Sequence, residues 1–357
     1  MARRTFVFLG VLGLHLAISC HGFSQSTEQK QATFQVKNTF TVRAPKGAKH
    51  IRMWMAVPQQ DAYTEIDNLR IVADAPVRYF NDSWGNKVAY TEVQNPPEKM
   101  VIQETFGVKR TEVHATTDAS RTRPLNDKER AALQRYLMPS TNVVVSDEVK
   151  KLAASIVGNE TNPIKAARKI FDWSYQNVNY WVKDPDNLKA SPVGSSDYCL
   201  RTKTGNCTDF HSLFSALAIA SGIPNRMVYG SLFKPTLNGF DVDASYHCWI
   251  EFFAPQIGWI PLDASLANIY WGDTPITEKN GKLIELTTST GYHGPDPSKV
   301  NYYFGNLDER RVVWSMGRDL MMQPAQKDGP VNSLPKIYVE IDGKQSADWD
   351  RVLTYKE

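Results

Sequence analysis

The chain has 357 residues, of which 42% are hydrophobic and 22% are charged. This length allows two or three globular domains, and the composition excludes a disordered or low-complexity protein. The formal net charge is only +3, and no dense run of Lys and Arg occurs, so nucleic acid is not expected as a partner.

The N terminus has the features of a secretory signal over residues 1–24. Two arginines precede an apolar run at residues 6–18, which is too short for a comfortable membrane span. Two cleavage sites are compatible with the sequence. Residues 16–20 resemble a bacterial lipobox, in which Cys20 would be lipidated, and residues 22–24 suit ordinary signal peptidase. We therefore expect export to the periplasm or cell envelope, either as a lipoprotein anchored through Cys20 or as a protein without the anchor.

Residues 32–122 are predicted to form an N-terminal β domain that resembles a small sandwich. Short segments rich in β-branched and aromatic residues, such as 34–42 and 51–57, are bounded by Pro, Gly, Asn or Asp. We expect a supporting or docking module, since a fold alone does not imply a function.

Residues 126–275 are predicted to form a core in which helices precede strands. Helices are expected at 126–137, at 146–157 between an N-cap serine and a glycine, and from Pro163 to about Tyr180. The segment 183–206 is expected to be a loop at the edge of a cleft.

Cys207 opens an apolar helical stretch. Phe210, Leu213 and Phe214 recur at helical spacing after it, and Gly205 stops the preceding loop. A cysteine at a helix N terminus lies at the positive end of the backbone dipole, which favours the reactive thiolate.

His247 and Asp263 lie in two predicted strands, residues 244–253 and 258–265. If the strands are antiparallel neighbours, Asp263 comes beside His247. Because side chains alternate along a strand, Trp249 shares the face of His247, and Cys248 is expected to face away from it.

These three residue types together suit nucleophilic catalysis. A thiol needs a base, which His247 can supply, and a carboxylate such as Asp263 can hold the second ring nitrogen. The backbone N–H of Cys207 is a natural donor to an oxyanion. Each residue alone is typical of a structural role, but their order and flanking residues together favour catalysis.

Four motifs lie in this part of the chain: Gly205-x-Cys207, Gly222-Ile-Pro-x-Arg226, His247-x-Trp249 and Gly258-Trp-x-x-x-Asp263. Together they resemble those of the bacterial transglutaminase-like family, whose fold is similar to that of papain-like cysteine peptidases. The resemblance covers roughly residues 140 to 270. Two positions depart from the family pattern: Ala264 follows the aspartate where proline is common, and Cys248 occupies the variable position of the histidine motif.

The resemblance implies an α+β fold with a papain-like transglutaminase core, a helix bundle packed on an antiparallel sheet or barrel. It implies Cys207 as nucleophile, His247 as base and Asp263 as the orienting residue, acting on a protein or peptide amide through a thioester. Hydrolysis and cross-linking both stay open. The alternative is a non-catalytic binding or scaffold protein of the cell envelope on the same fold.

Aromatic residues provide further candidates for the site. Relatives place an aromatic oxyanion donor upstream of the cysteine, which makes Tyr180 and Trp181 candidates, although both also suit core packing. Trp249 is a candidate cleft residue.

No metal or organic cofactor is expected. Cys207 and His211 have the i, i+4 spacing of a zinc-chelating pair, but a full site needs two more ligands and Cys-x-x-Cys pairs are absent. No acidic loop indicates calcium. Three cysteines follow the leader. In an oxidising compartment an odd number suggests one free thiol, and a disulfide between Cys199 and Cys248 is an alternative that the sequence does not decide.

Residues 276–357 are predicted to be a C-terminal β extension. Strands are expected near 300–305, 311–316 and 336–341, where they would extend the sheet or close a barrel behind the core.

Overall fold

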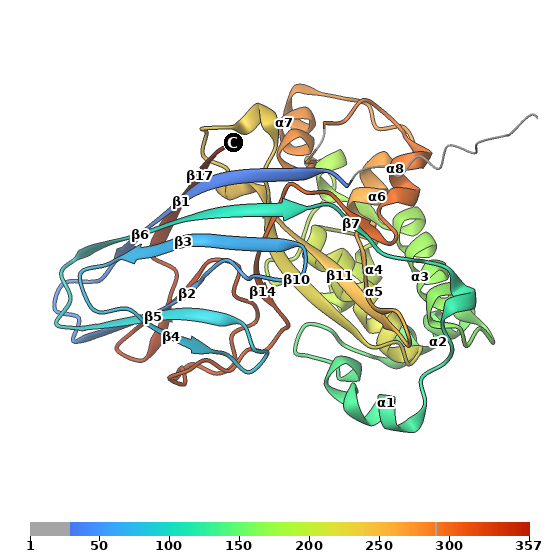
Figure 1. The fold of residues 1–357 in the computed structure, drawn as a ribbon, viewed down its shortest axis with the longest axis horizontal. Coiled ribbons are helices and arrows are strands. Elements are labelled where there is room, and N and C mark those ends of the chain that lie inside the picture. Colours follow the sequence, from blue (N-terminus) through green and yellow to red (C-terminus); the bar gives the residue numbers. More distant parts are fainter. Residues whose placement is uncertain (1–28, 290) are drawn as a thin grey trace, which may run out of the picture.

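The computed structural model describes residues 29–289 and 291–357. The fold is α+β, as predicted: two β sheets lie at one end, helices lie at the other, and a third sheet lies between them (Figure 1). The predicted leader and Cys20 lie outside the described residues. Within the described ranges, no helix is long and apolar enough to cross a membrane.

The first sheet has the strand order β17-β1-β6-β3 and is antiparallel throughout. Burial alternates along β1, and Phe34, Val36 and Phe40 point inward, so the period-2 pattern of the sequence predicts its inner face. The strands are β1 (Gln31–Arg43), β3 (Thr64–Val72), β6 (Lys99–Thr111) and β17 (Trp349–Lys356).

The second sheet has the order β16-β15-β2-β5-β4. A hydrophobic cluster that includes Phe40, Met53, Ile102 and Val339 joins it to the first sheet, which makes the pair a sandwich. The strands are β2 (His50–Ala56), β4 (Arg78–Asn81), β5 (Lys87–Gln94), β15 (Ile337–Ile341) and β16 (Lys344–Ser346).

Strands from both ends of the chain therefore build the sandwich. β17 pairs with β1, and β15 pairs with β2. The C-terminal region thus joins the N-terminal sheets rather than only the core. The domain boundaries given above stay predictions.

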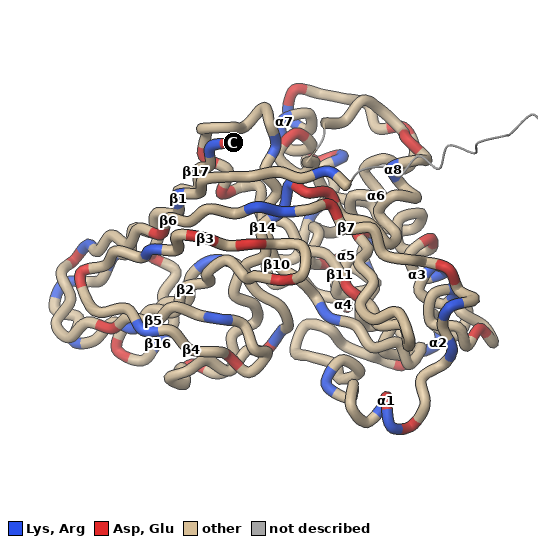
Figure 2. The backbone as a smooth tube through the Cα atoms, in the orientation of Figure 1, with Lys and Arg blue, Asp and Glu red and all other residues tan. Residues whose placement is uncertain are grey.

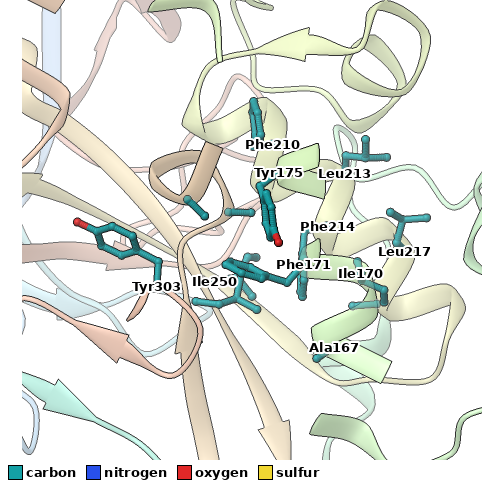
Figure 3. Close-up of a cluster of buried hydrophobic side chains, with 14 of the residues drawn as sticks. Ala167, Ile170, Phe171, Tyr175, Phe210, Leu213, Phe214, Leu217, Ile250 and Tyr303 are labelled. Atoms are coloured by element: carbon teal, nitrogen blue, oxygen red, sulfur yellow. The ribbon is translucent and has the colours of Figure 1, made fainter. Parts of the chain in front are cut away.

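The third sheet, β12-β11-β10-β14, carries the helices on one face. Figure 3 shows side chains of α3 and α5 in one cluster with Ile250 of β11. This packing seats α5 against the strand that contains His247. The strands are β10 (Asn225–Leu232), β11 (Tyr246–Ala254), β12 (Gly258–Leu262) and β14 (Arg311–Met316), and the helices are α2 (Asp147–Val157), α3 (Pro163–Asn177), α5 (Cys207–Ala220) and α6 (Ala264–Tyr270).

The prediction of a strand near 300–305 is wrong. Residues 300–302 form the end of a helix, α8 (Pro297–Tyr302), and residues 303–305 follow that helix. Asp296 caps this helix and Pro297 occupies its first turn, a start signal that outweighs the strand preference of the aromatic run after it. The other α helices are α1 (Asp127–Ala132), α4 (Ser196–Thr202) and α7 (Glu278–Thr287), and the short strands are β7 (Val113–His114), β8 (Asn179–Tyr180), β9 (Thr204–Gly205) and β13 (Asn306–Leu307). Single 3-10 turns form at Ala119–Arg121, Gln134–Leu137, Trp181–Lys183, Pro235–Leu237 and Asp243–Ser245.

Basic and acidic residues are interspersed over the sandwich and the helical end alike (Figure 2). This distribution agrees with the small net charge of the sequence.

Candidate active site

Cys207 is the first residue of α5, as predicted. The side chain of Asn206 caps the helix by accepting hydrogen bonds from the N–H groups of Thr208 (2.9 Å) and Asp209 (3.0 Å). The Asp209 carboxylate accepts in return from the N–H of Asn206 at 2.9 Å, which completes a capping box. The thiol therefore lies in a rigid first turn at the positive end of the helix.

Asp209 also ties the preceding segment to α5. Its carboxylate accepts hydrogen bonds from the N–H groups of Ser191 (3.0 Å) and Ser195 (2.7 Å). A Cβ on Gly205 would lie 2.3 Å from the Cβ of Asp209. The glycine of the Gly-x-Cys motif is thus explained by the close approach of its backbone to Asp209.

His247 and Asp263 are in direct contact, as the predicted strand pairing required. β11 and β12 are antiparallel neighbours, and Nε2 of His247 lies 2.7 Å from Oδ2 of Asp263. The second strand ends at Leu262, earlier than predicted, because Asp263 caps α6 by accepting from the N–H of Leu266 at 3.1 Å. The cap holds the carboxylate in one orientation.

Arg311 of β14 is a site residue that no sequence motif indicated. Its Nη1 donates to Oδ2 of Asp263 at 3.0 Å, and its Nε donates to Oδ2 of Asp308 at 3.0 Å. Arg311 and Asp263 are fully buried. Burial would raise the pKa of Asp263, but His247 and Arg311 hold this pKa well below its usual value.

The electrostatics of the site favour a charged thiol–imidazole pair. Burial would raise the pKa of Cys207, but the neighbouring Cys248 thiol and the His247 ring hold it well below its usual value. Burial would lower the pKa of His247, but Asp263 and Cys207 raise it to about 9. Nδ1 of His247 is buried without a hydrogen-bond partner, so this is the ring nitrogen left for Cys207.

Cys248 lies in the site rather than away from it, which corrects the sequence-based expectation. It shares the face of β11 that carries Ile250, and α5 covers that face. Its sulfur contacts Nδ1 of His211 (3.4 Å) and the hydroxyl of Thr208 (3.6 Å). Cys248 and Ile250 pack with α5 and Trp249 packs in another cluster, so these three positions alternate as predicted. Which face α5 covers could not be read from the alternation.

A cleft of about 410 Å³ reaches Cys207. Tyr180, Trp181 and Tyr246 are among the residues that line it. Burial raises the pKa of Tyr180 well above its usual value, and the neighbouring Cys207 adds to the effect. Tyr180 therefore keeps its proton beside the thiol.

Part of the chain resembles a known family. Residues 150–264 match the model of the transglutaminase-like superfamily. This part of the chain is a transglutaminase-like core.

Two matches extend beyond that core. An uncharacterised protein of Haemophilus influenzae is 23% identical over 335 residues, covering 87% of this chain and 86% of the relative. A crystal structure from Cytophaga hutchinsonii, described as a proposed cysteine protease, has a TM-score of 0.57 and 18% identity, covering 92% of this chain and 93% of the other. The shared fold therefore includes the β sandwich.

A third match is more distant. The periplasmic domain of TgpA from Pseudomonas aeruginosa has a TM-score of 0.30 and 14% identity, covering 63% of this chain and 88% of that domain.

The other predicted candidates are placed as follows. Trp249 is buried among Val228 and Val313 on the far side of the third sheet, and it does not line the cleft around Cys207. The three cysteines of the described residues are free and buried, so the structure contains no Cys199–Cys248 disulfide. No group of three or more His, Cys, Asp or Glu within the described ranges is arranged to hold a metal ion.

Proposed function

We propose that the transglutaminase-like core catalyses thiol-dependent acyl transfer or hydrolysis at amide bonds of a protein or peptide. Cys207 is the nucleophile, His247 the acid and base, and Asp263 the group that orients the ring. One observation carries this proposal. The ring of His247 contacts the buried carboxylate of Asp263, with Nε2 and Oδ2 2.7 Å apart, and the same ring lowers the pKa of the Cys207 thiol.

The proposed reaction proceeds in two halves. The Cys207 thiolate attacks the carbonyl carbon. The backbone N–H of Cys207, in the first turn of α5, donates a hydrogen bond to the carbonyl oxygen as that oxygen becomes negatively charged. His247 gives its Nδ1 proton to the leaving ammonia or amine as the C–N bond breaks, which leaves a thioester. Water or a second amine then attacks the thioester while His247 takes up its proton, the C–S bond breaks, and Cys207 leaves as the thiolate. The Tyr180 hydroxyl is a candidate second donor to the oxyanion.

We place this activity outside the cytoplasm because the first 24 residues have the features of an export signal. The mass of the N-terminal peptide of the purified protein tests this placement. A lipidated N-terminal Cys20 would indicate the lipoprotein alternative, and an intact leader would contradict export.

The pH dependence of iodoacetamide alkylation at Cys207, resolved by peptide mapping, tests the catalytic pair. Because the pKa of Cys207 is lowered and that of His247 is about 9, the charged pair exists between these two values. We expect rapid alkylation well below pH 8.5, the approximate pKa of a free thiol. Cys199, whose pKa is raised by burial, should stay inert and serves as an internal control.

Variants separate the site from the rest of the protein. His247→Ala should abolish the low-pH reactivity, whereas His114→Ala, at an exposed histidine outside the cleft, should keep it. If Cys207 titrates like an ordinary thiol in the wild type, the catalytic proposal fails. A scaffold role would then be supported if Cys207→Ala keeps the biological function.

A further inference from the structure

A second thiol and a second imidazole lie beside the first pair and share its carboxylate. Cys248 Sγ lies 3.4 Å from Nδ1 of His211, and Nε2 of His211 lies 3.7 Å from Oδ1 of Asp263. The other oxygen of Asp263 is the one that contacts His247. In the proposed reaction Cys248 and His211 neither form a bond to the substrate nor transfer a proton, and both side chains are fully buried.

We propose that Cys248 is a resolving thiol, which forms a disulfide with Cys207 after a peroxide has oxidised Cys207. The inference rests on the reactive Cys207 thiol of the proposed function. It adds a redox modification site whose co-reactant is a small hydroperoxide.

The sulfurs of Cys207 and Cys248 both contact the hydroxyl of Thr208. Oγ1 of Thr208 lies 3.9 Å from Sγ of Cys207 and 3.6 Å from Sγ of Cys248. The hydroxyl of Tyr246 lies 3.0 Å from this Thr208 hydroxyl and holds it in place. The Cys248 thiol is also a hydrogen-bond partner of Cys207, and this contact helps to lower the pKa of Cys207.

The steps balance without a further reagent. The Cys207 thiolate attacks one peroxide oxygen, the O–O bond breaks, and the leaving oxygen takes a proton as water or alcohol. The product is a sulfenic acid on Cys207. The Cys248 sulfur then attacks the Cys207 sulfur, the S–S bond forms and the S–O bond breaks, and the hydroxide leaves as water. The two thiols lose two electrons and the peroxide gains them.

His211 suits the role of base in the second step. Burial lowers the pKa of His211 to about 4, so the ring is neutral near pH 7 and Nδ1 can accept the Cys248 proton. Burial and the nearby Cys207 raise the pKa of Cys248 well above its usual value. Cys248 therefore stays protonated at rest, and Cys207 is the sulfur that meets the oxidant first.

The test treats the reduced full chain with hydrogen peroxide and follows it by intact mass and peptide mapping. We expect the loss of two hydrogen atoms, a Cys207–Cys248 cross-linked peptide and loss of Cys207 alkylation, all reversed by dithiothreitol. Cys248→Ser should instead gain oxygen at Cys207, as sulfinic acid, with no recovery by the reductant. Cys199→Ser is the matched control and should behave like the wild type.

Two outcomes overturn the inference. One is sulfinic acid at Cys207 in the wild type without a Cys207–Cys248 link, and the other is the absence of any peroxide product at Cys207. Low-pH alkylation of the same untreated sample separates the proposals, because its persistence in either case leaves the catalytic proposal standing. Far-UV circular dichroism verifies that Cys248→Ser is folded, and His211→Gln should slow disulfide formation as a second, independent variant.

Discussion

Asp263 holds several groups of the site at once. One carboxylate oxygen accepts from His247 and Arg311, and the other accepts from the hydroxyl of Ser265 and the N–H of Leu266. The same side chain thus orients the imidazole, neutralises a buried guanidinium and starts a helix. A substitution here should affect both reactivity and stability.

Asp263→Asn tests this double role. The amide cannot stabilise the charged ring, so the rate of the acyl-transfer step should fall by about 10⁴-fold, as in other enzymes with such a triad. Because Arg311 loses a buried partner, the free energy of unfolding should fall by about 3–5 kcal/mol. Activity assays and urea denaturation measure the two effects. Asp308→Asn, which also removes a partner of Arg311, should lower stability but leave the low-pH alkylation of Cys207 in place.

The start of α5 positions the thiol. The capping box, the Asp209 contacts to the preceding segment and the close approach of Gly205 all lie within a few residues of Cys207. The low pKa of the thiol depends on this turn as well as on His247 and Cys248.

Gly205→Ala should displace Asp209, because the added Cβ would lie 2.3 Å from its Cβ. With the cap disrupted, the free energy of unfolding should fall by about 1–2 kcal/mol, and the alkylation profile of Cys207 should shift to higher pH. Denaturation and the alkylation series measure both effects. Gly281→Ala in α7, whose nearest neighbour would be 3.3 Å away, is the matched control. Unchanged Cys207 reactivity in Gly205→Ala would contradict the role given to this turn.

The sequence predicted those parts of the site that depend on local patterns. The start of α5 follows from its capping residues, and the contact of His247 with Asp263 follows from two neighbouring strands joined by a short turn. Arg311 could not be predicted, because it reaches Asp263 from a strand that joins the other edge of the sheet. The position of Cys248 depends on which sheet face α5 covers, which is a property of tertiary packing.

The first and last strands of the described chain pair with each other in one sheet. β1 pairs with β17 along eight positions, from Gln35 opposite Lys356 to Val42 opposite Trp349. On its inner face, Tyr355 stacks on Phe233 with ring centroids 4.4 Å apart and packs edge-on against Phe34. Phe233 directly follows β10, so this contact joins the sandwich to the sheet of the core.

Tyr355→Ala should therefore destabilise the protein by about 3–5 kcal/mol, the usual cost of truncating a buried aromatic side chain. Val352→Ala lies on the same strand with a side chain 47% exposed, and it should change stability by no more than about 0.5 kcal/mol. Urea denaturation compares the two variants. Equal losses of stability in the two variants would mean that β17 contributes little to the contact between the sandwich and the sheet of the core.

The pairing of β1 with β17 also has a consequence for synthesis. The hydrogen bond between Arg43 and Asp348 spans 305 positions, so this edge of β1 stays unpaired until residues 349–356 have been synthesised. Contacts of such long range form late and slowly. Until the last strand arrives, β1 presents an unpaired edge that invites aggregation. A chaperone that covers this edge would therefore protect the unfinished chain from aggregation.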